Sequence, residues 1–186
     1  MNHSSTPTIL LVPGLRDHVP EHWQTLLEAK LPGARSVPPL ETDKLSRAAR
    51  VAELDRTLRS IDGPVVLVAH SAGVMMTVHW AREHRGDIAG ALLVTPVDLE
   101  HPLPEGYPTY DAIAANGWLP TPTERLWFPS IVCASTNDPL AQFDAVAAMA
   151  ERWGSRLVNL GAVGHLNPAA GYGEWPQADT LIQELM

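Results

Sequence analysis

The stretch "VVLVAHSAGVMM" (residues 65–76) joins a run of apolar residues to a second apolar segment through a cluster of small and polar ones. The first run, 65–69, is rich in valine and is typical of a strand buried on both faces of a parallel sheet. The residues from 72 onward have helical spacing. Ser71 is therefore predicted to lie in a strand-to-helix turn, where a strained backbone can lift a serine hydroxyl above the sheet as a nucleophile.

The residues that flank Ser71 are as small as such a turn requires. Strand and helix backbones nearly touch two residues before and two residues after the serine, which explains the G-x-S-x-G form of the motif. Ala69 and Gly73 occupy these positions, so the chain departs from the motif by one methyl group. The alternative interpretation of Ser71 is a helix N-cap. The position of the match between a strand and a helix favours a nucleophile.

Short apolar, often β-branched runs alternate with segments of helical period along the rest of the chain, the pattern of a parallel sheet covered by helices. The 186 residues, 45% of them hydrophobic, suffice for one core. We predict a single α/β domain over residues 1–186, with an about six-stranded parallel sheet, helices on both faces and little or no lid. The expected strands are 8–12, 34–37, 65–69, 90–94, 130–134 and 156–160, and the expected helices lie within 23–31, 51–61, 72–84, 140–152 and 175–185.

Composition excludes several classes of protein. The formal charge of -8, from 21 acidic and 13 basic residues, argues against a nucleic-acid binder. The single cysteine, Cys133, excludes an internal disulfide and fits a reducing compartment. The opening "MNHSSTPT" has no signal-peptide pattern, and no apolar run is long enough for a membrane helix. We expect a cytoplasmic protein that binds neither nucleic acid nor membrane, as a monomer or weak homo-oligomer.

A serine nucleophile needs a base, and eight histidines are candidates, at positions 3, 18, 22, 70, 79, 84, 101 and 165. His165, in "LGAVGHLNP", follows the last predicted strand and so faces the carboxyl edge of the sheet, where active sites of open α/β sheets lie. His70 is expected to point away from Ser71. His18 and His22 are four residues apart, but Pro20 between them and the lack of an H-E-x-x-H pattern argue against a metal site.

The base needs an acid to orient it, and Asp138 in "CASTNDPL" is the best placed, directly after the strand predicted at 130–134. The alternative for Asp138 is a helix N-cap ahead of Pro139. The other aspartates considered have less fixed positions (Asp98, Asp111 and Asp144). The order Ser71, Asp138, His165 along the chain is that of α/β-hydrolases.

The remaining requirement is a pair of backbone N–H groups that stabilise an oxyanion. Ala72, directly after the serine, supplies one. The loop "VPGLRDHVPEHW" after the first strand should supply the other, from Leu15 or Arg16, and Leu15 is preferred.

Residues 96–129 interrupt the alternation of strands and helices. They hold seven of the seventeen prolines and only a weak helical pattern, "TYDAIAANGW". Long ordered loops often form lids or binding loops, so the segment is a candidate substrate-side cap. A packed surface excursion is the equally weighted alternative.

Several blocks together resemble a known family: "ILLVPGL", "PEHWQ", "AHSAG", "FPSIVCASTNDP", "GHLNPAAG" and "AGYGEWP". They are similar to the small α/β-hydrolases grouped with retinoblastoma-binding protein nine and its bacterial YdeN-like relatives. The resemblance implies a compact α/β-hydrolase fold of six parallel strands, with the catalytic serine, aspartate and histidine at Ser71, Asp138 and His165. The Leu-x-Cys-x-Glu motif of that group is absent, so no retinoblastoma partner is expected.

These observations predict a carboxylesterase-like serine hydrolase that cleaves a small ester or amide through an acyl-enzyme, without cofactor or metal. A peptidase or aminopeptidase with the same triad is one alternative, in which Glu100 or Glu105 would receive a free amine. A protein-binding module that keeps the fold without turnover is the other.

Overall fold

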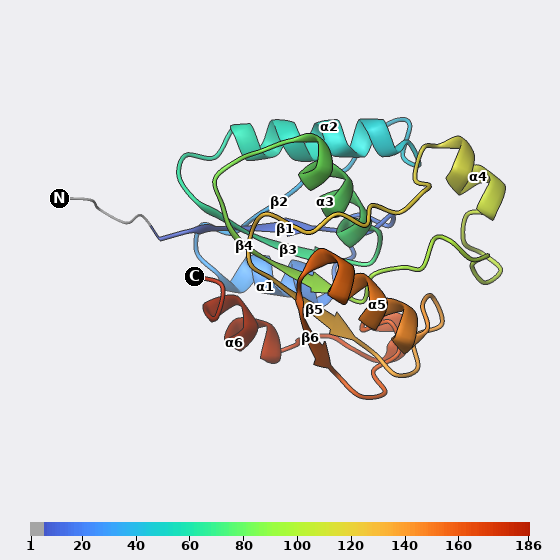
Figure 1. Ribbon diagram of the computed structural model, residues 1–186. Coiled ribbons are helices and arrows are strands. Elements are labelled where there is room, and N and C mark those ends of the chain that lie inside the picture. The colour runs from blue at the N-terminus through green and yellow to red at the C-terminus, as the bar shows by residue number, and fades with distance from the viewer. Residues whose placement is uncertain (1–5) are drawn as a thin grey trace.

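The computed structural model describes residues 6–186, so His3, which we expected to take no part in the site, lies outside the described residues. Six strands form one sheet in the order β2-β1-β3-β4-β5-β6, and every neighbouring pair is parallel (Figure 1). The predicted α/β-hydrolase architecture is confirmed. The strands are β1 (Thr8–Val12), β2 (Arg35–Ser36), β3 (Val65–His70), β4 (Ile88–Val94), β5 (Ser130–Ala134) and β6 (Arg156–Asn159).

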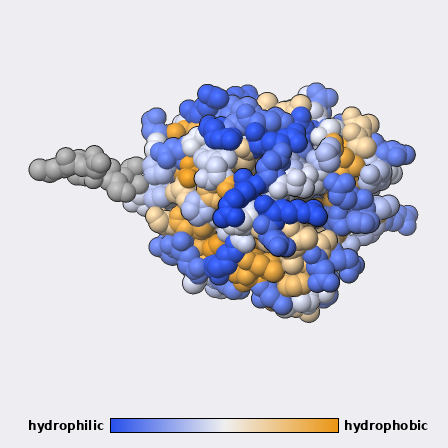
Figure 2. All heavy atoms as spheres, viewed as in Figure 1, coloured by the Kyte–Doolittle hydropathy of each residue, from blue (hydrophilic) through white to orange (hydrophobic). Residues whose placement is uncertain are grey.

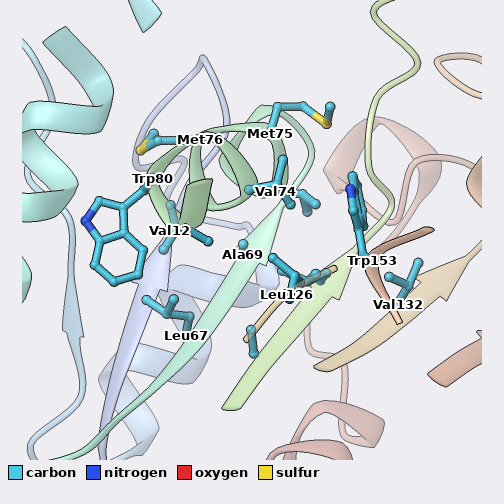
Figure 3. Close-up of a cluster of buried hydrophobic side chains, with 14 of the residues drawn as sticks. Val12, Leu67, Ala69, Val74, Met75, Met76, Trp80, Leu126, Val132 and Trp153 are labelled. Atoms are coloured by element: carbon cyan, nitrogen blue, oxygen red, sulfur yellow. The ribbon is translucent and has the colours of Figure 1, made fainter. Parts of the chain in front are cut away.

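Helices cover both faces of the sheet and enclose two layers of core (Figure 1). Alternate residues of β3 point to opposite faces. Leu67 and Ala69 pack with residues of α2 (Arg47–Arg59), α3 (Ala72–Glu83) and α5 (Phe143–Trp153). Val66 and Val68 pack on the other face with residues of α1 (Trp23–Lys30) and α6 (Gln177–Gln183). Figure 3 shows the first of these layers, where Val12, Leu67 and Ala69 face Val74 of α3.

Local signals explain where the helices begin and end. His22 and Ser46 are the N-caps of α1 and α2, and each accepts a hydrogen bond from a backbone N–H of the first turn. Gly154 ends α5 in the left-handed conformation at φ 70°, as predicted. The expected start of this helix at residue 140 is wrong, because residues 139 and 140 form a turn, a bend follows at 141, and Gln142 is the N-cap.

The segment 96–129 runs past the carboxyl end of the sheet and contains a short helix, α4 (Tyr110–Ala115), at the right of Figure 1. Two hydrogen bonds attach Trp118, which follows α4, to the body of the protein. The Nε1 of Trp118 donates to the carbonyl oxygen of Leu45 at 2.7 Å, and His79 on α3 donates through Nε2 to the carbonyl oxygen of Trp118 at 3.1 Å. We call residues 97–118 the cap segment.

The face shown in Figure 2 is covered mostly by hydrophilic residues, with hydrophobic ones scattered among them. Among residues 6–186, no helix combines the length and the apolar character that crossing a bilayer requires.

Candidate active site

Ser71 joins β3 to α3 in a strained backbone conformation, φ 59° and ψ -126°. A positive φ is uncommon for any residue other than glycine and is found where surrounding structure enforces it. Two hydrogen bonds hold the turn: the Ser71 N–H donates to Val94 O at 3.0 Å, and the Val74 N–H donates to Ser71 O at 3.0 Å. Ser71 is the N-cap residue of α3 by position, as the alternative had it, but its hydroxyl makes no capping hydrogen bond to the helix.

Gly73 explains why the position two residues after the serine must be small. A Cβ at Gly73 would lie 2.1 Å from the carbonyl oxygen of Val12 and 2.8 Å from that of Pro13. The first turn of α3 therefore rests directly on the backbone at the end of β1. Ala69, two residues before the serine, is completely buried, and its methyl group is accommodated in the core.

The serine lies where the connections of the sheet change direction. β1 leads to β2 on one side, and β3 pairs with β1 on the other, so the loops after β1 and β3 diverge at this point. Gly14 in the first of these loops lies against the serine, since a Cβ there would be 3.5 Å from Ser71 Oγ. This crevice is where α/β sheets bind ligands.

His165 and Asp138 form a buried pair at the same edge of the sheet. The Nδ1 of His165 lies 2.8 Å from Asp138 Oδ2 and 3.0 Å from Oδ1. Asp138 Oδ1 also accepts from the Leu140 N–H at 2.9 Å, although Gln142 rather than Asp138 caps α5. An ionised Asp138 fixes the proton of a neutral His165 on Nδ1 and leaves Nε2 free to accept one.

The loop that carries His165 is fastened to the loop that carries Asp138. Asn137 Oδ1 accepts from the Gly164 N–H at 2.7 Å, and Ser135 Oγ accepts from the Val163 N–H at 3.2 Å. Because Asn137 precedes Asp138 and Gly164 precedes His165, these bonds hold the two loops together and fix Asp138 and His165 relative to each other.

Ser71 and His165 both line one cavity of about 300 Å³. The Nε2 of His165 is buried and has no hydrogen-bond partner among residues 6–186. No hydrogen bond joins it to Ser71 Oγ in this part of the chain. Catalytic hydrogen bonds are often long without substrate and tighten in the reacting complex. Nε2 is thus a buried acceptor at the wall of the cavity that also contains the serine.

His70 does not point away from the site, so this expectation is wrong. Its ring lies 4.9 Å from that of His165, and its Nε2 donates to the His165 carbonyl oxygen at 2.9 Å. The alternation of β3 was the signal that sequence reasoning missed: residues 66, 68 and 70 share one face, and Leu166 packs on that face.

His22 extends this cluster, with its ring 4.5 Å from that of His70. Burial lowers the pKa of His22 to about 4, and the nearby His165 lowers it in the same direction. Burial, with His165 and His22, also lowers the pKa of His70 well below its usual value. Both rings are therefore neutral near pH 7, and His165 has no cationic histidine beside it.

A tight turn follows β1 and contains two of the candidate oxyanion donors, the N–H groups of Leu15 and Arg16, while the third, Ala72, begins α3. The Asp17 N–H donates to Gly14 O at 3.1 Å and closes this turn. The N–H groups of Ala72, Leu15 and Arg16 donate no hydrogen bond within residues 6–186. Arg50, buried on α2, holds the turn from behind through Asp17 Oδ1 at 3.2 Å and Leu15 O at 3.4 Å. Nothing in the sequence distinguished Arg50 from a solvated arginine.

Other candidates from the sequence lie apart from the cavity. Glu100 and Glu105 do not line it, and Glu100 accepts a hydrogen bond from the Thr121 N–H. Asp98 pairs with His101, and Asp111 and Asp144 lie in the first turns of α4 and α5. Within the described residues, no group of three or more His, Cys, Asp or Glu side chains is arranged to hold a metal ion.

The sequence model of the serine hydrolase family matches residues 9–184, almost the entire chain. The chain belongs to the serine hydrolase family. This hydrolase is also similar in structure to a YdeN-like hydrolase from Pectobacterium atrosepticum, with a TM-score of 0.82, 29% identity, and coverage of 98% of this chain and 94% of the other.

Two further solved structures share the fold of this hydrolase. The ydeN gene product of B. subtilis is 16% identical, with a TM-score of 0.72 and coverage of 97% and 98% of the two chains. A thermophilic esterase from Thermogutta terrifontis is 18% identical, with a TM-score of 0.62 and coverage of 98% and 89%. The comparison with curated proteins found no match. The predicted YdeN-like relationship is supported, and the link to retinoblastoma-binding protein nine stays a prediction.

Proposed function

We propose that the protein cleaves a small carboxylic ester, with Ser71 as nucleophile, His165 as general base and Asp138 as the group that orients His165. The observation that carries the proposal is the strained Ser71 at the wall of a cavity that His165 also lines. The buried Nε2 of His165 has no hydrogen-bond partner within residues 6–186, and its Nδ1 faces Asp138. A serine hydroxyl is a poor nucleophile without such a base.

The reaction proceeds in two steps. Ser71 Oγ bonds to the ester carbonyl carbon while its proton passes to His165 Nε2, and the carbon–oxygen bond to the alcohol then breaks as His165 returns the proton to that oxygen. In the second step water, activated by His165, attacks the acyl-enzyme and releases the acid and free Ser71. The backbone N–H groups of Ala72 and Leu15 receive the developing oxyanion.

A fluorophosphonate probe tests the proposal, because it labels only an activated serine. We expect the wild type to be labelled and to give a burst with p-nitrophenyl acetate at pH 7.5. Ser71→Ala should abolish both, and His165→Ala should reduce turnover by at least about a thousandfold.

Ser60→Ala, a change at an exposed serine after α2 that does not line the cavity, serves as the matched control and should be labelled as the wild type is. A folded wild-type protein that resists labelling and hydrolyses no ester would overturn the proposal and favour the binding-module alternative.

A further inference from the structure

The cavity beside Ser71 has one apolar wall that the triad does not use. Most of its lining from the cap segment and the loop before α2 is hydrophobic: Leu45, Val97, Leu99, Leu103, Ile113 and Trp118, with Gly106, Tyr107 and Pro108 beside them. We call this wall the apolar pocket. Most of its residues pack into the core layer that contains α2 and α3, so they are held by the body of the protein.

The two sides of Ser71 differ in chemistry. His165 lies on the side of the other core layer, since its ring is 4.9 Å from that of His70, which in turn lies 5.9 Å from the ring of Trp23 in that layer. His165 must protonate the leaving group, so that group has to lie on the histidine side. Ser71 Oγ and the oxyanion occupy two more directions around the reacting carbon. The fourth substituent, the acyl chain, is left facing the apolar pocket.

The charges around the cavity also restrict the substrate. Asp17 is the one acidic side chain among the described residues that line it, and Asp17 is already paired with the buried Arg50. Arg16 adds a positive charge at the exposed edge, where its guanidinium lies 5.7 Å from the ring centre of Tyr107 in the cap segment. A protonated amine in the cavity would therefore lose its water without gaining a counter-ion.

We infer that the substrate is an ester of an uncharged aliphatic acid of medium length, whose acyl chain enters the apolar pocket and which carries no free α-amino group. This inference rests on the proposed function and names its substrate class. The cavity of about 300 Å³ includes the space around Ser71 and opens to solvent, so the apolar pocket buries the first several carbons of an acyl chain, and the far end of a long fatty acyl chain would lie outside it.

The first test is a series of p-nitrophenyl esters from acetate to dodecanoate. Burial of each methylene should raise kcat/KM by about threefold between acetate and hexanoate. The gain should have ended at dodecanoate, because carbons that lie beyond the apolar pocket gain no burial from it. A flat series, or one that still rises at dodecanoate, would overturn the inference.

Leu103→Trp narrows the pocket from a half-buried position and should leave the core intact. We expect it to lower kcat/KM for hexanoate relative to acetate by about tenfold. Tyr110→Trp is the matched control, since Tyr110 is an exposed residue of the same segment and does not line the cavity. An equal effect of the two changes on the chain-length profile would contradict the assignment of the pocket.

A matched pair of methyl esters tests the exclusion of amines. Leucine methyl ester differs from methyl 4-methylpentanoate only by its α-amino group, and at pH 6.5 it should be hydrolysed at least about tenfold less efficiently. Equal or better hydrolysis of the leucine ester would favour the aminopeptidase alternative. If the wild-type protein reacts with a short-chain fluorophosphonate but prefers neither medium acyl chains nor the ester without an amino group, only the inferred substrate class is overturned. Absence of labelling and of all hydrolysis would overturn the proposed function itself.

Discussion

The side chain of His70 donates a hydrogen bond from Nε2 to the carbonyl oxygen of His165 at 2.9 Å. The residue next to the candidate nucleophile thus holds the backbone of the candidate base, 95 positions further along the chain. The two rings are also in contact, with their centres 4.9 Å apart. This relationship makes His70 a candidate positioning residue for the proposed reaction.

His70→Ala should lower kcat by about tenfold to a hundredfold with little change in KM, because His165 loses the contact that fixes its position. His70→Gln retains an N–H donor at a similar reach and should recover part of the loss. Steady-state kinetics with p-nitrophenyl butyrate measures both, and circular dichroism checks the fold. If the folded alanine variant retains wild-type kcat, His70 has no positioning role.

Gly73→Ala should prevent folding or destabilise the protein by more than about 3 kcal/mol, because the added methyl would overlap backbone atoms of β1, which cannot yield as a side chain does. Gly86→Ala is the matched control, since a methyl there would meet only the ring of Trp80 at 3.4 Å. Urea denaturation measures both variants. A Gly73→Ala protein as stable as the control would contradict the contact between α3 and β1.

Arg50→Met should destabilise the protein by about 2–3 kcal/mol, because it leaves Asp17 and the carbonyl oxygen of Leu15 without their partner. It should also reduce kcat, since the turn that presents the Leu15 N–H is released. Adding Asp17→Asn to Arg50→Met should restore about 1 kcal/mol by removing the unpaired charge. Chemical denaturation of Arg50→Met, Asp17→Asn and the double variant gives the coupling energy, and strictly additive effects would argue against the ion pair.

Stability should decrease in mild acid because of His79. Burial lowers the pKa of His79 from 6.5 to about 4, so between these pH values the unfolded chain binds more protons than the folded one. The free energy of unfolding is therefore fully retained above about pH 6.5 and falls as the pH drops towards 4. His22 and His70, whose pKa values are also lowered, act in the same direction.

His79→Gln isolates this contribution, because glutamine has a donor that can replace Nε2 towards Trp118 O but does not titrate. The decrease in unfolding free energy between pH 7 and pH 4 should be smaller than in wild type by about 2–3 kcal/mol. Urea denaturation at several pH values measures it. An unchanged pH dependence would mean that His79 is protonated as easily in the folded protein as in the unfolded one.

Much of the fold could be predicted from the sequence, because parallel strands that are buried on both faces consist of short, continuous runs of apolar residues. The strands β1, β3, β4 and β5 were located in this way. The edge strands β2 and β6 contain polar and exposed residues, and β2 is shorter than expected, since it pairs with β1 only at Arg35 and Ser36. The start of α5 was misplaced because Pro139 is as suitable for a turn as for a first helical residue, and Asp138 Oδ1 bonds the Leu140 N–H in that turn.

The candidate site was harder to predict where it depends on contacts between distant segments. The positions of Ser71, Asp138 and His165 after strands could be predicted, since the carboxyl ends of parallel strands share one edge. Their catalytic roles stay predictions. The orientation of His70 towards His165 could have been predicted from the alternation of side chains along β3. The hydrogen bonds of Arg50 to the loop after β1 could not be predicted, because the sequence of an amphipathic helix does not distinguish a buried arginine from a solvated one.

The close approach of Gly73 to Val12 is a part of this protein that should not tolerate substitution, whereas the opposite wall of the cavity should. Main-chain atoms of β1 and α3 meet there with no side chain between them, so the position of Ser71 is independent of which residues form the opposite wall of the cavity. Exchanging side chains at Leu45, Leu103 or Ile113 would reshape the space offered to a reactant while the serine keeps its place. An engineer who seeks another acid specificity would begin with those three positions and leave the glycine alone.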